Sequence, residues 1–353
     1  MKRGNILQKQ AVNILAALAA VCLFGCGSQS ENTNLQAGME LIEQYDFQGA
    51  LECFDLARLN NEDLQLTSRG EGLAYMGLGE YEQAQDAFLA SIQNAGNKLT
   101  ALEYDTNYYL AAAYMKQGKY TEAYDIYSAI IALKSKETDA YYLRACVLLQ
   151  QGDYEAAVAD FEKVFALEPD DLGLVTDAYV EMQAAGFGEE GKTFLLELME
   201  EREKSLSDGD KGTIYYYLED YQNARTYLDG YLNGSDAKRS LLLGQTYEKL
   251  GDMNYATVVY QTYLASNEPD AAIYNSLGMC YMAQEKYEEA LEAFEAGLAT
   301  DSGEYLQELK FNMIAAYEYS GEFTQARTLM EEYLQAYPDD DKAKREYEFL
   351  QTR

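Results

Sequence analysis

Residues 186–193 combine the residue types of a phosphate-binding loop. They read GFGEEGKT, which fits the pattern G-x-x-x-x-G-K-[ST] and also contains G-x-G-x-x-G. In such a loop the backbone N–H groups cradle phosphates, the lysine reaches the β- and γ-phosphates, and the threonine hydroxyl binds Mg²⁺. Lys192 and Thr193 would have these roles here. The segment therefore raises the hypothesis of a P-loop NTPase.

The surroundings of this segment argue against nucleotide binding. A phosphate-binding loop follows a buried strand, whereas residues 171–185 have the apolar spacing of a helix. Glu189 and Glu190 would repel a triphosphate, and no apolar strand that ends in an aspartate follows to bind magnesium. We therefore expect no nucleotide to bind, and the NTPase stays a remote alternative.

The composition gives little support to other catalytic chemistry. The chain has no histidine, which removes Ser-His and Cys-His pairs, histidine bases and imidazole metal ligands. The three aspartates at 339–341 lack the alternating spacing and the glycine of a calcium loop. Cys53, Cys146 and Cys280 have no metal-ligand spacing. We expect a protein that is not an enzyme and has no cofactor and no metal site.

The start of the chain has the features of an exported protein. Three basic residues precede an apolar run at 11–24, which is shorter than the about 20 residues that a membrane-spanning helix needs. Residues 23–26, LFGC, resemble the lipobox of bacterial lipoproteins. The resemblance implies a signal peptide at 1–25, a diacylglycerol on the thiol of Cys26, and a polar tether at 26–34. Acyl chains on Cys26 would anchor the protein to the outer side of the membrane. The alternative is a plain signal peptide with an incidental cysteine.

One sequence motif recurs about every 34 residues between residues 35 and 338. It consists of a turn residue, one spacer, an aromatic, two spacers and an alanine, as in GEYEQA at 79–84 and GDYEAA at 152–157. A large apolar residue follows four positions after most of the alanines, and a small residue usually stands seven positions before the motif. The alanine slot holds Ala50, Ala84, Ala123, Ala157, Gly191, Ala224, Ala256, Ala290 and Ala326. Because apolar residues three and four apart share one helical face, and because glycine suits a helix C-terminus, each copy predicts two helices joined by a short turn.

These motifs resemble those of the tetratricopeptide repeat family. The resemblance implies an all-α fold, a right-handed α-solenoid of about nine helix-turn-helix units at 35–338, with a C-terminal capping helix at 339–353. The family's early tryptophan is absent, and Tyr141 and Tyr274 stand at its position.

The repeat register also explains the phosphate-loop pattern. It assigns Gly186 to the turn and Gly191 to the alanine slot of the fifth unit, which is degenerate. The repeat thus accounts for both glycines of the pattern, and only the match at Lys192 and Thr193 would be coincidental. The sixth unit lacks the turn glycine.

In this family the first helix of each unit lines a concave groove that holds an extended or helical peptide. By register, the groove candidates are Tyr108, Ala112, Met115, Tyr142, Cys146, Leu149, Asn275, Met279 and Met282. Tyrosine and methionine suit adaptable recognition, although the same side chains could equally pack between helices. The run at 215–217, three tyrosines, is a further aromatic candidate.

The charge of the chain restricts its partners. With 27 basic and 60 acidic residues, the net charge is −33, and loss of residues 1–25 would make it more negative. Such a field repels nucleic acid and anionic lipid headgroups. It favours a basic or neutral protein or peptide, although solubility alone would also account for it.

These features predict a lipoprotein that is anchored in the bacterial cell membrane and faces outside the cytoplasm. Its solenoid would be a scaffold or adaptor that binds proteins non-covalently at the cell envelope. A second hypothesis is a ligand-capture lipoprotein that binds a peptide or a sugar for uptake. Sugar-binding platforms favour tryptophan as well as tyrosine, and the chain has no tryptophan.

Overall fold

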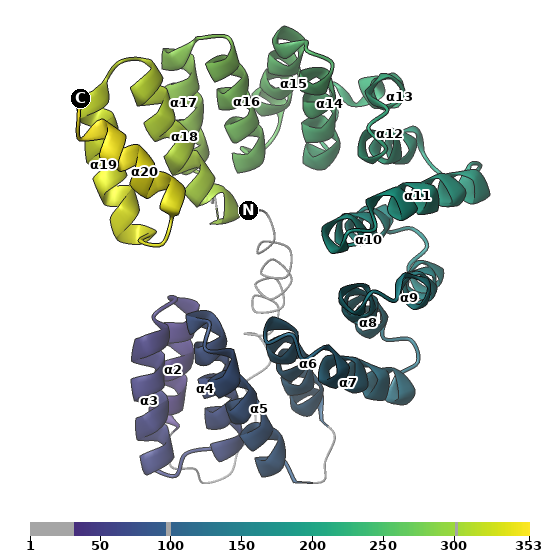
Figure 1. The fold of residues 1–353 in the computed structure, drawn as a ribbon, viewed down its shortest axis with the longest axis vertical. Coiled ribbons are helices and arrows are strands. Elements are labelled where there is room, and N and C mark those ends of the chain that lie inside the picture. Colours follow the sequence, from purple (N-terminus) through teal and green to yellow (C-terminus); the bar gives the residue numbers. More distant parts are fainter. Residues whose placement is uncertain (1–31, 97–99, 301–302) are drawn as a thin grey trace. The chain divides into compact units, whose positions relative to one another are not determined.

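The protein is all-helical in the computed structural model (Figure 1). The structure describes residues 32–96, 100–300 and 303–353. These residues contain 19 α-helices, α2 to α20, and two 3₁₀ helices, and none of them lies in a β-strand. The predicted all-α fold class is confirmed. Cys26 and the predicted signal peptide at 1–25 lie outside the described residues.

The chain divides into two compact units, Met1–Gly191 and Lys192–Arg353. Helix α11 (Gly188–Arg202) crosses the boundary. The other helices of the first unit are α2 (Thr33–Glu43), α3 (Phe47–Leu59), α4 (Leu64–Leu78), α5 (Tyr81–Asn94), α6 (Ala101–Lys116), α7 (Tyr120–Leu133), α8 (Thr138–Gln151), α9 (Tyr154–Leu167) and α10 (Leu172–Ala185). Those of the second unit are α12 (Asp208–Tyr217), α13 (Tyr221–Leu228), η1 (Asp229–Tyr231), α14 (Ala237–Lys249), α15 (Met253–Ser266), α16 (Ala271–Ala283), α17 (Tyr287–Leu298), η2 (Gly303–Tyr305), α18 (Leu306–Tyr319), α19 (Phe323–Ala336) and α20 (Asp341–Leu350). Among the described helices, none combines the length and the apolarity needed to cross a bilayer.

Each of the two compact units is a stack of helical hairpins, one hairpin for each repeat. Helices that follow one another along the chain pack together, as α4 does with α5 and α16 with α17 (Figure 1). Even-numbered helices also touch, for example α8 with α10 and α14 with α16. The first helices of neighbouring repeats therefore share one face within each unit.

The repeat register describes the core. Every residue in the alanine slot is buried, and the eight alanines there have no exposed surface. The large residues four positions later are also buried: Phe54, Phe88, Tyr127, Phe161, Leu195, Leu228, Tyr260, Phe294 and Met330. Several of these side chains lie directly over a glycine of the preceding helix. A Cβ atom on Gly72 would come within 2.4 Å of the Phe88 ring, and one on Gly278 within 2.3 Å of the Phe294 ring.

In the degenerate fifth repeat the same two helices pack together, but the large and the small residue at one contact are exchanged. Tyr179 stands at the position that is small in most repeats, and its side chain is 2% exposed. Gly191 replaces the alanine opposite, where a Cβ atom would lie 3.0 Å from Cδ2 of Tyr179. The missing methyl group on one helix therefore makes room for the additional ring on the other.

The turn between the two helices of a repeat has one backbone conformation throughout. The residue five positions before each alanine slot has a positive φ. Six of these residues are the glycines at 79, 118, 152, 186, 251 and 321, as the sequence predicts for most of them. Tyr45, Glu219 and Glu285 adopt the same conformation at φ 62°, 63° and 59°. A side chain in this region costs about 1–2 kcal/mol, so hairpin packing imposes the turn even where glycine is absent.

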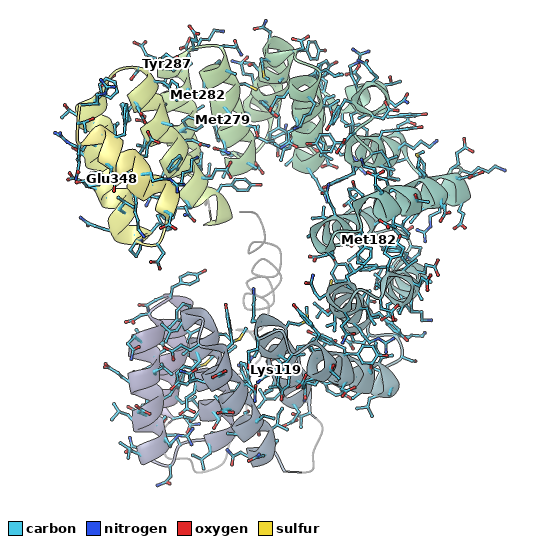
Figure 2. All side chains as sticks on the ribbon, viewed as in Figure 1. Lys119, Met182, Met279, Met282, Tyr287 and Glu348 are labelled. Carbon is cyan, nitrogen blue, oxygen red and sulfur yellow. The ribbon has the colours of Figure 1, made fainter. Side chains whose placement is uncertain are left out.

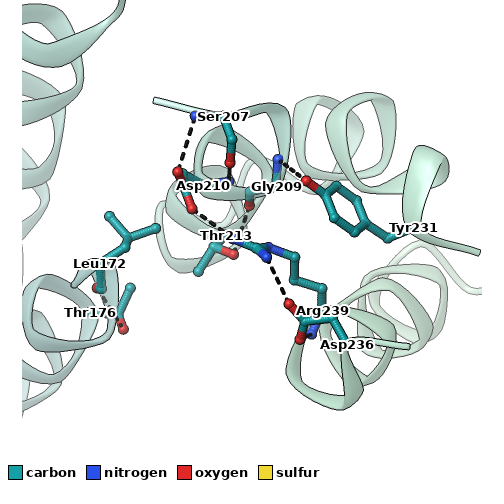
Figure 3. A network of polar contacts seen from close by, with 9 residues as sticks. All are labelled: Leu172, Thr176, Ser207, Gly209, Asp210, Thr213, Tyr231, Asp236 and Arg239. Carbon is teal, nitrogen blue, oxygen red and sulfur yellow. Dashed lines mark hydrogen bonds and ion pairs between the residues drawn. The ribbon is translucent and has the colours of Figure 1, made fainter. Parts of the chain in front are cut away.

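A polar network stabilises the sixth repeat, whose first helix α12 has only ten residues (Figure 3). Ser207 and Asp210 form a reciprocal capping box at its start, with N–H···O distances of 3.0 and 3.2 Å. The Arg239 guanidinium of α14 donates to Asp210 at 2.8 Å, and the Gly209 N–H donates to the Tyr231 hydroxyl at 3.1 Å. The Arg239 bond connects α12 to the following repeat, and the Tyr231 bond connects it to η1, which follows α13.

The last helix, α20, has the bounds that the sequence predicts for the capping helix, about 341–350. The Asp340 carboxylate accepts the N–H groups of Lys342 and Ala343 at its start. Ala343 and Leu350 are fully buried against side chains that include Met330 and Tyr333 of α19, while most of the charged residues of the helix are exposed.

Candidate partner-binding surface

The segment with the phosphate-loop pattern is a helix–turn–helix junction. It follows α10 rather than a strand, and Gly186 ends that helix at φ +97°. The N–H groups of Gly186 and Phe187 donate to carbonyls of α10, at 3.1 Å to Gln183 and 2.9 Å to Met182. The Gly191 N–H donates to the Phe187 carbonyl at 2.8 Å. Because these N–H groups have partners in the chain, they cannot cradle a phosphate without breaking helical bonds.

The charged residues of this segment also lack the arrangement of a phosphate site. The Lys192 ammonium lies 3.8 Å from the Glu219 carboxylate. Glu189 and Glu190 occupy the first turn of α11, where the helix dipole stabilises their carboxylates. These carboxylates would compete with a phosphate for the N–H groups of that turn. The helical context predicted for residues 171–185 is confirmed.

The candidates on α6 are half-buried. The Tyr108 ring lies 5.9 Å from the ring of Tyr127, measured between centroids. Met115 packs against the same cluster, which is built around Tyr127 and Ile130. Ala112 is also half-buried. Each of the three therefore has a packing partner or a covered side and also some accessible surface.

The candidates on α8 belong to the core. Tyr142, Cys146 and Leu149 are 3%, 3% and 2% exposed. The Tyr142 ring packs against Phe161 at 5.4 Å between centroids. Helix α10 packs against α8 and helps to cover this face. Because they are buried, these three side chains pack between helices, which is the alternative that the sequence left open for these positions.

The candidates on α16 divide between core and surface. Asn275 is 6% exposed, donates to the Glu308 carboxylate at 3.1 Å, and accepts from the Asn312 amide at 2.8 Å. Met279 is 45% exposed and Met282 is half-buried; both are labelled in Figure 2. Asn275 thus joins α16 to α18, and the two methionines remain available to a partner.

The structure therefore gives two separate groups of candidates. Tyr108 and Met115 lie in the first compact unit, and Met279 and Met282 lie in the second. Partner binding by these side chains stays a prediction. The tyrosines at 215–217 are half-buried, and the Tyr216 hydroxyl donates to Gln245 of α14 at 3.1 Å.

Sequence reasoning missed one buried acid, Glu181 on α10. It stands ten positions before the alanine slot. In the other repeats after the first, this position holds a buried uncharged residue: Ala74, Ala113, Val147, Ile214, Thr246, Cys280 and Ala316. Glu181 is 8% exposed. Comparing the repeats column by column would have found it, whereas motif searches could not.

The three cysteines of the helical region are free thiols, with Cys146 and Cys280 buried and Cys53 half-buried. Within the described ranges, no group of three or more acidic, cysteine or histidine side chains could hold a metal ion.

Family models described as tetratricopeptide repeat match residues 69–140, 138–171, 271–303 and 308–340. The chain contains tetratricopeptide repeats. The matched segments include α6, α8 and α16, which carry the candidate residues. In a tetratricopeptide repeat these are first helices, as the register predicts.

Several solved structures are similar to this chain. A tetratricopeptide repeat protein from Parabacteroides merdae ATCC 43184 is 17% identical, with 71% of this chain and 99% of that chain covered and a TM-score of 0.42. MamA is 20% identical over 47% of this chain and 95% of its own, with a TM-score of 0.38. YrrB, described as a TPR protein with an unusual peptide-binding site, is 19% identical over 63% of this chain and 97% of its own, with a TM-score of 0.35. No curated protein matches the chain.

Proposed function

We propose that this protein is a lipid-anchored scaffold or adaptor that faces outside the cytoplasm and binds proteins at the bacterial cell envelope. Tetratricopeptide repeats serve protein–protein interaction, and the chain contains several. The observation that carries the proposal is the exposed side chain of Met279 on α16, beside the half-buried Met282, because an apolar side chain gains from being covered by a partner.

The chemistry of the chain supports binding rather than catalysis. The sequence has no histidine, and the phosphate-loop pattern is a turn between two helices. Binding would then be non-covalent and would depend on shape and on the chemistry of individual side chains.

The anchor is supported by the sequence at the start of the chain. The apolar run at 11–24 and the following LFGC at 23–26 have the order of a signal peptide and a lipidation site. Thioether attachment of a diacylglycerol to Cys26 would hold the repeats close to the membrane, because the polar tether ends at residue 34.

Site-specific photo-crosslinking in the native cell tests the scaffold. A photo-reactive amino acid at position 279 is compared with one at position 258. Both residues are 45% exposed and lie in the same compact unit, but Val258 is on the second helix of its repeat. We expect recurrent protein adducts from position 279 and few from position 258, and equal yields from both would contradict the proposal.

The captured molecules also separate the two binding hypotheses. Envelope proteins recovered repeatedly from position 279 support a scaffold. Recovery of transport components alone, together with a bound peptide or sugar in the purified protein, would support ligand capture for uptake instead.

Mass spectrometry of the purified mature protein tests the anchor. We expect an N-terminal peptide that begins at Cys26 and carries the mass of a diacylglycerol, with or without a further acyl chain. An unmodified N-terminus at any other residue would refute lipidation.

A further inference from the structure

Glu181 places a carboxyl group where neighbouring repeats have apolar or small core residues. The equivalent residues Val147 and Ile214 have no exposed surface, and Glu181 is 8% exposed. A buried carboxyl group costs free energy unless it is paired or hydrogen-bonded. Residues that break a local packing rule at such a cost are expected at functional sites.

The environment of Glu181 leaves part of its carboxyl group unsatisfied. Its Oε1 atom is buried and accepts no hydrogen bond within the described part of the chain. Burial, and then the negative charge of Asp177 one turn earlier on α10, raises the pKa of Glu181. The guanidinium of Arg144 on α8 does not compensate, because it is bonded to the Asp160 carboxylate of α9 at 2.7 and 2.8 Å.

Glu181 lies near enough to Cys146, a predicted groove position on α8, for its charge to act on that thiol, and α10 packs against α8. Burial, and next the Glu181 charge, raises the pKa of the Cys146 thiol. Two turns earlier on α8 stands Asp139, whose pKa burial raises first and the charges of Glu137 and Glu168 raise further. The first helices α8 and α10 thus hold one buried carboxyl group, that of Glu181, and the exposed carboxyl groups of Asp139 and Asp177.

A hydroxyl group on α6 lies near the acidic groups at the start of α8. The Tyr108 oxygen is buried and interacts with the Glu137 carboxylate at the start of α8. Burial raises its pKa, and the charges of Glu137 and Asp139 do so further. Tyr108 is also one of the half-buried groove candidates, so these acidic groups act on a predicted groove position.

We propose that the carboxyl group of Glu181, where α10 packs against α8, receives a lysine or arginine side chain of the protein partner. The inference rests on the scaffold function proposed above and names the chemistry that one part of the partner must have. The cation would give Glu181 the charge partner that its own chain does not supply. A metal ion fits less well, because the described residues contain no cluster of three or more ligands.

Peptide binding tests whether Glu181 receives a cationic side chain. The probes are fluorescein-labelled alanine peptides with a single lysine, and their arginine, glutamine and glutamate versions, measured by anisotropy with the full protein. We expect the lysine and arginine peptides to bind and the other two not to. Glu181→Gln should weaken binding of both cationic peptides by about tenfold or more.

A variant with the same change in net charge controls for the negative field of the whole protein. Glu155, exposed in the first turn of α9, is replaced in Glu155→Gln, which should change the affinity less than about twofold. Glu181→Met restores an apolar core residue, so it should unfold at a higher urea concentration than the wild type while binding the cationic peptides as weakly as Glu181→Gln.

Three results would overturn the inference. One is equal affinity of the wild type for the lysine and glutamine peptides or no binding of either, and another is unchanged binding in Glu181→Gln. The third comes from repeating the photo-crosslinking at position 279 in the Glu181→Gln variant. If partner adducts form at the wild-type yield, Glu181 has no role in binding, and the scaffold function is unaffected. Loss of adducts in the wild type itself would instead contradict the scaffold function.

Discussion

The contact between Phe294 and Gly278 should make Gly278→Ala destabilising. An added Cβ atom would lie 2.3 Å from Cε1 of Phe294 and 2.7 Å from both Cδ1 and Cζ. Carbon atoms in contact are usually about 3.5–4.0 Å apart, so the ring or the helix must move by about 1 Å. Phe294 is fully buried and has no free space to move into.

The magnitude follows from two opposing effects. Overpacking a core costs about 1–3 kcal/mol, and a rigid buried ring at this distance places the cost near the upper end. Alanine is better than glycine inside a helix by about 1 kcal/mol, which offsets part of it. We therefore expect the free energy of unfolding to fall by about 2 kcal/mol.

Urea unfolding followed by far-UV circular dichroism measures this change, and hydrogen exchange of peptides from α16 and α17 localises it. Gly191→Ala and Gly230→Ala complete a series. The added Cβ would meet Tyr179 at 3.0 Å in the former and nothing within 4 Å in the latter. The loss of stability should decrease in the order Gly278, Gly191, Gly230, and the last substitution should be neutral or stabilising.

A double variant checks the mechanism. Phe294→Leu shortens the side chain that the new methyl group would strike, so Gly278→Ala should cost at least about 1 kcal/mol less in that background than in the wild type. A Gly278→Ala protein as stable as the wild type, or a cost that is unchanged by Phe294→Leu, would refute the reasoning that the ring requires a glycine beneath it.

Three further predictions follow from other parts of the fold. Glu285→Gly should raise the free energy of unfolding by about 1 kcal/mol, because glycine adopts the positive φ of this turn without strain, and an unchanged urea midpoint would contradict this. Burial, and then the neighbouring Glu346 carboxyl, raises the pKa of Glu318 from 4.5 to about 7. The folded state therefore holds this proton more tightly than the unfolded state, and stability is lost as the pH rises through that window. Glu318→Gln should leave the thermal midpoint unchanged near pH 4 and raise it near pH 8, whereas a lower midpoint near pH 8 would show that the pair is stabilising. Calorimetry should detect no binding of Mg-ATP, and micromolar binding that Lys192→Ala abolishes would restore the NTPase hypothesis.

The sequence predicted the parts of this fold that depend on a repeated local pattern. Each position of the repeat has one environment, so nine weak matches together predicted the buried alanine slot and most of the turns. The exceptions arise where two residues compensate each other. Tyr179 and Gly191 each depart from the residue type that the repeat predicts at their positions. Only their contact shows that the larger side chain at 179 fills the space left by the missing methyl group at 191.

The candidate surface was less predictable because it depends on contacts between repeats. Tyr142 and Leu149 have the spacing of groove residues, but a groove position is accessible only if the neighbouring first helix leaves it uncovered. That depends on the side chains of α10, which the register of α8 does not contain. Glu181 was missed for a related reason, since one acid among 60 becomes unusual only when it is compared with the uncharged residues at the same position of the other repeats after the first.

The packing of a large side chain over a glycine has a consequence for how the protein acquires its structure. In the repeats with this contact the two residues are sixteen positions apart, as Gly72 is from Phe88 and Gly278 from Phe294. Chains dominated by such short-range contacts fold fast and can begin at any repeat. A chain that emerges N-terminus first can therefore bury the core of each hairpin as soon as that hairpin has emerged. The exposed apolar surface at any moment is then that of about one repeat rather than of the whole chain.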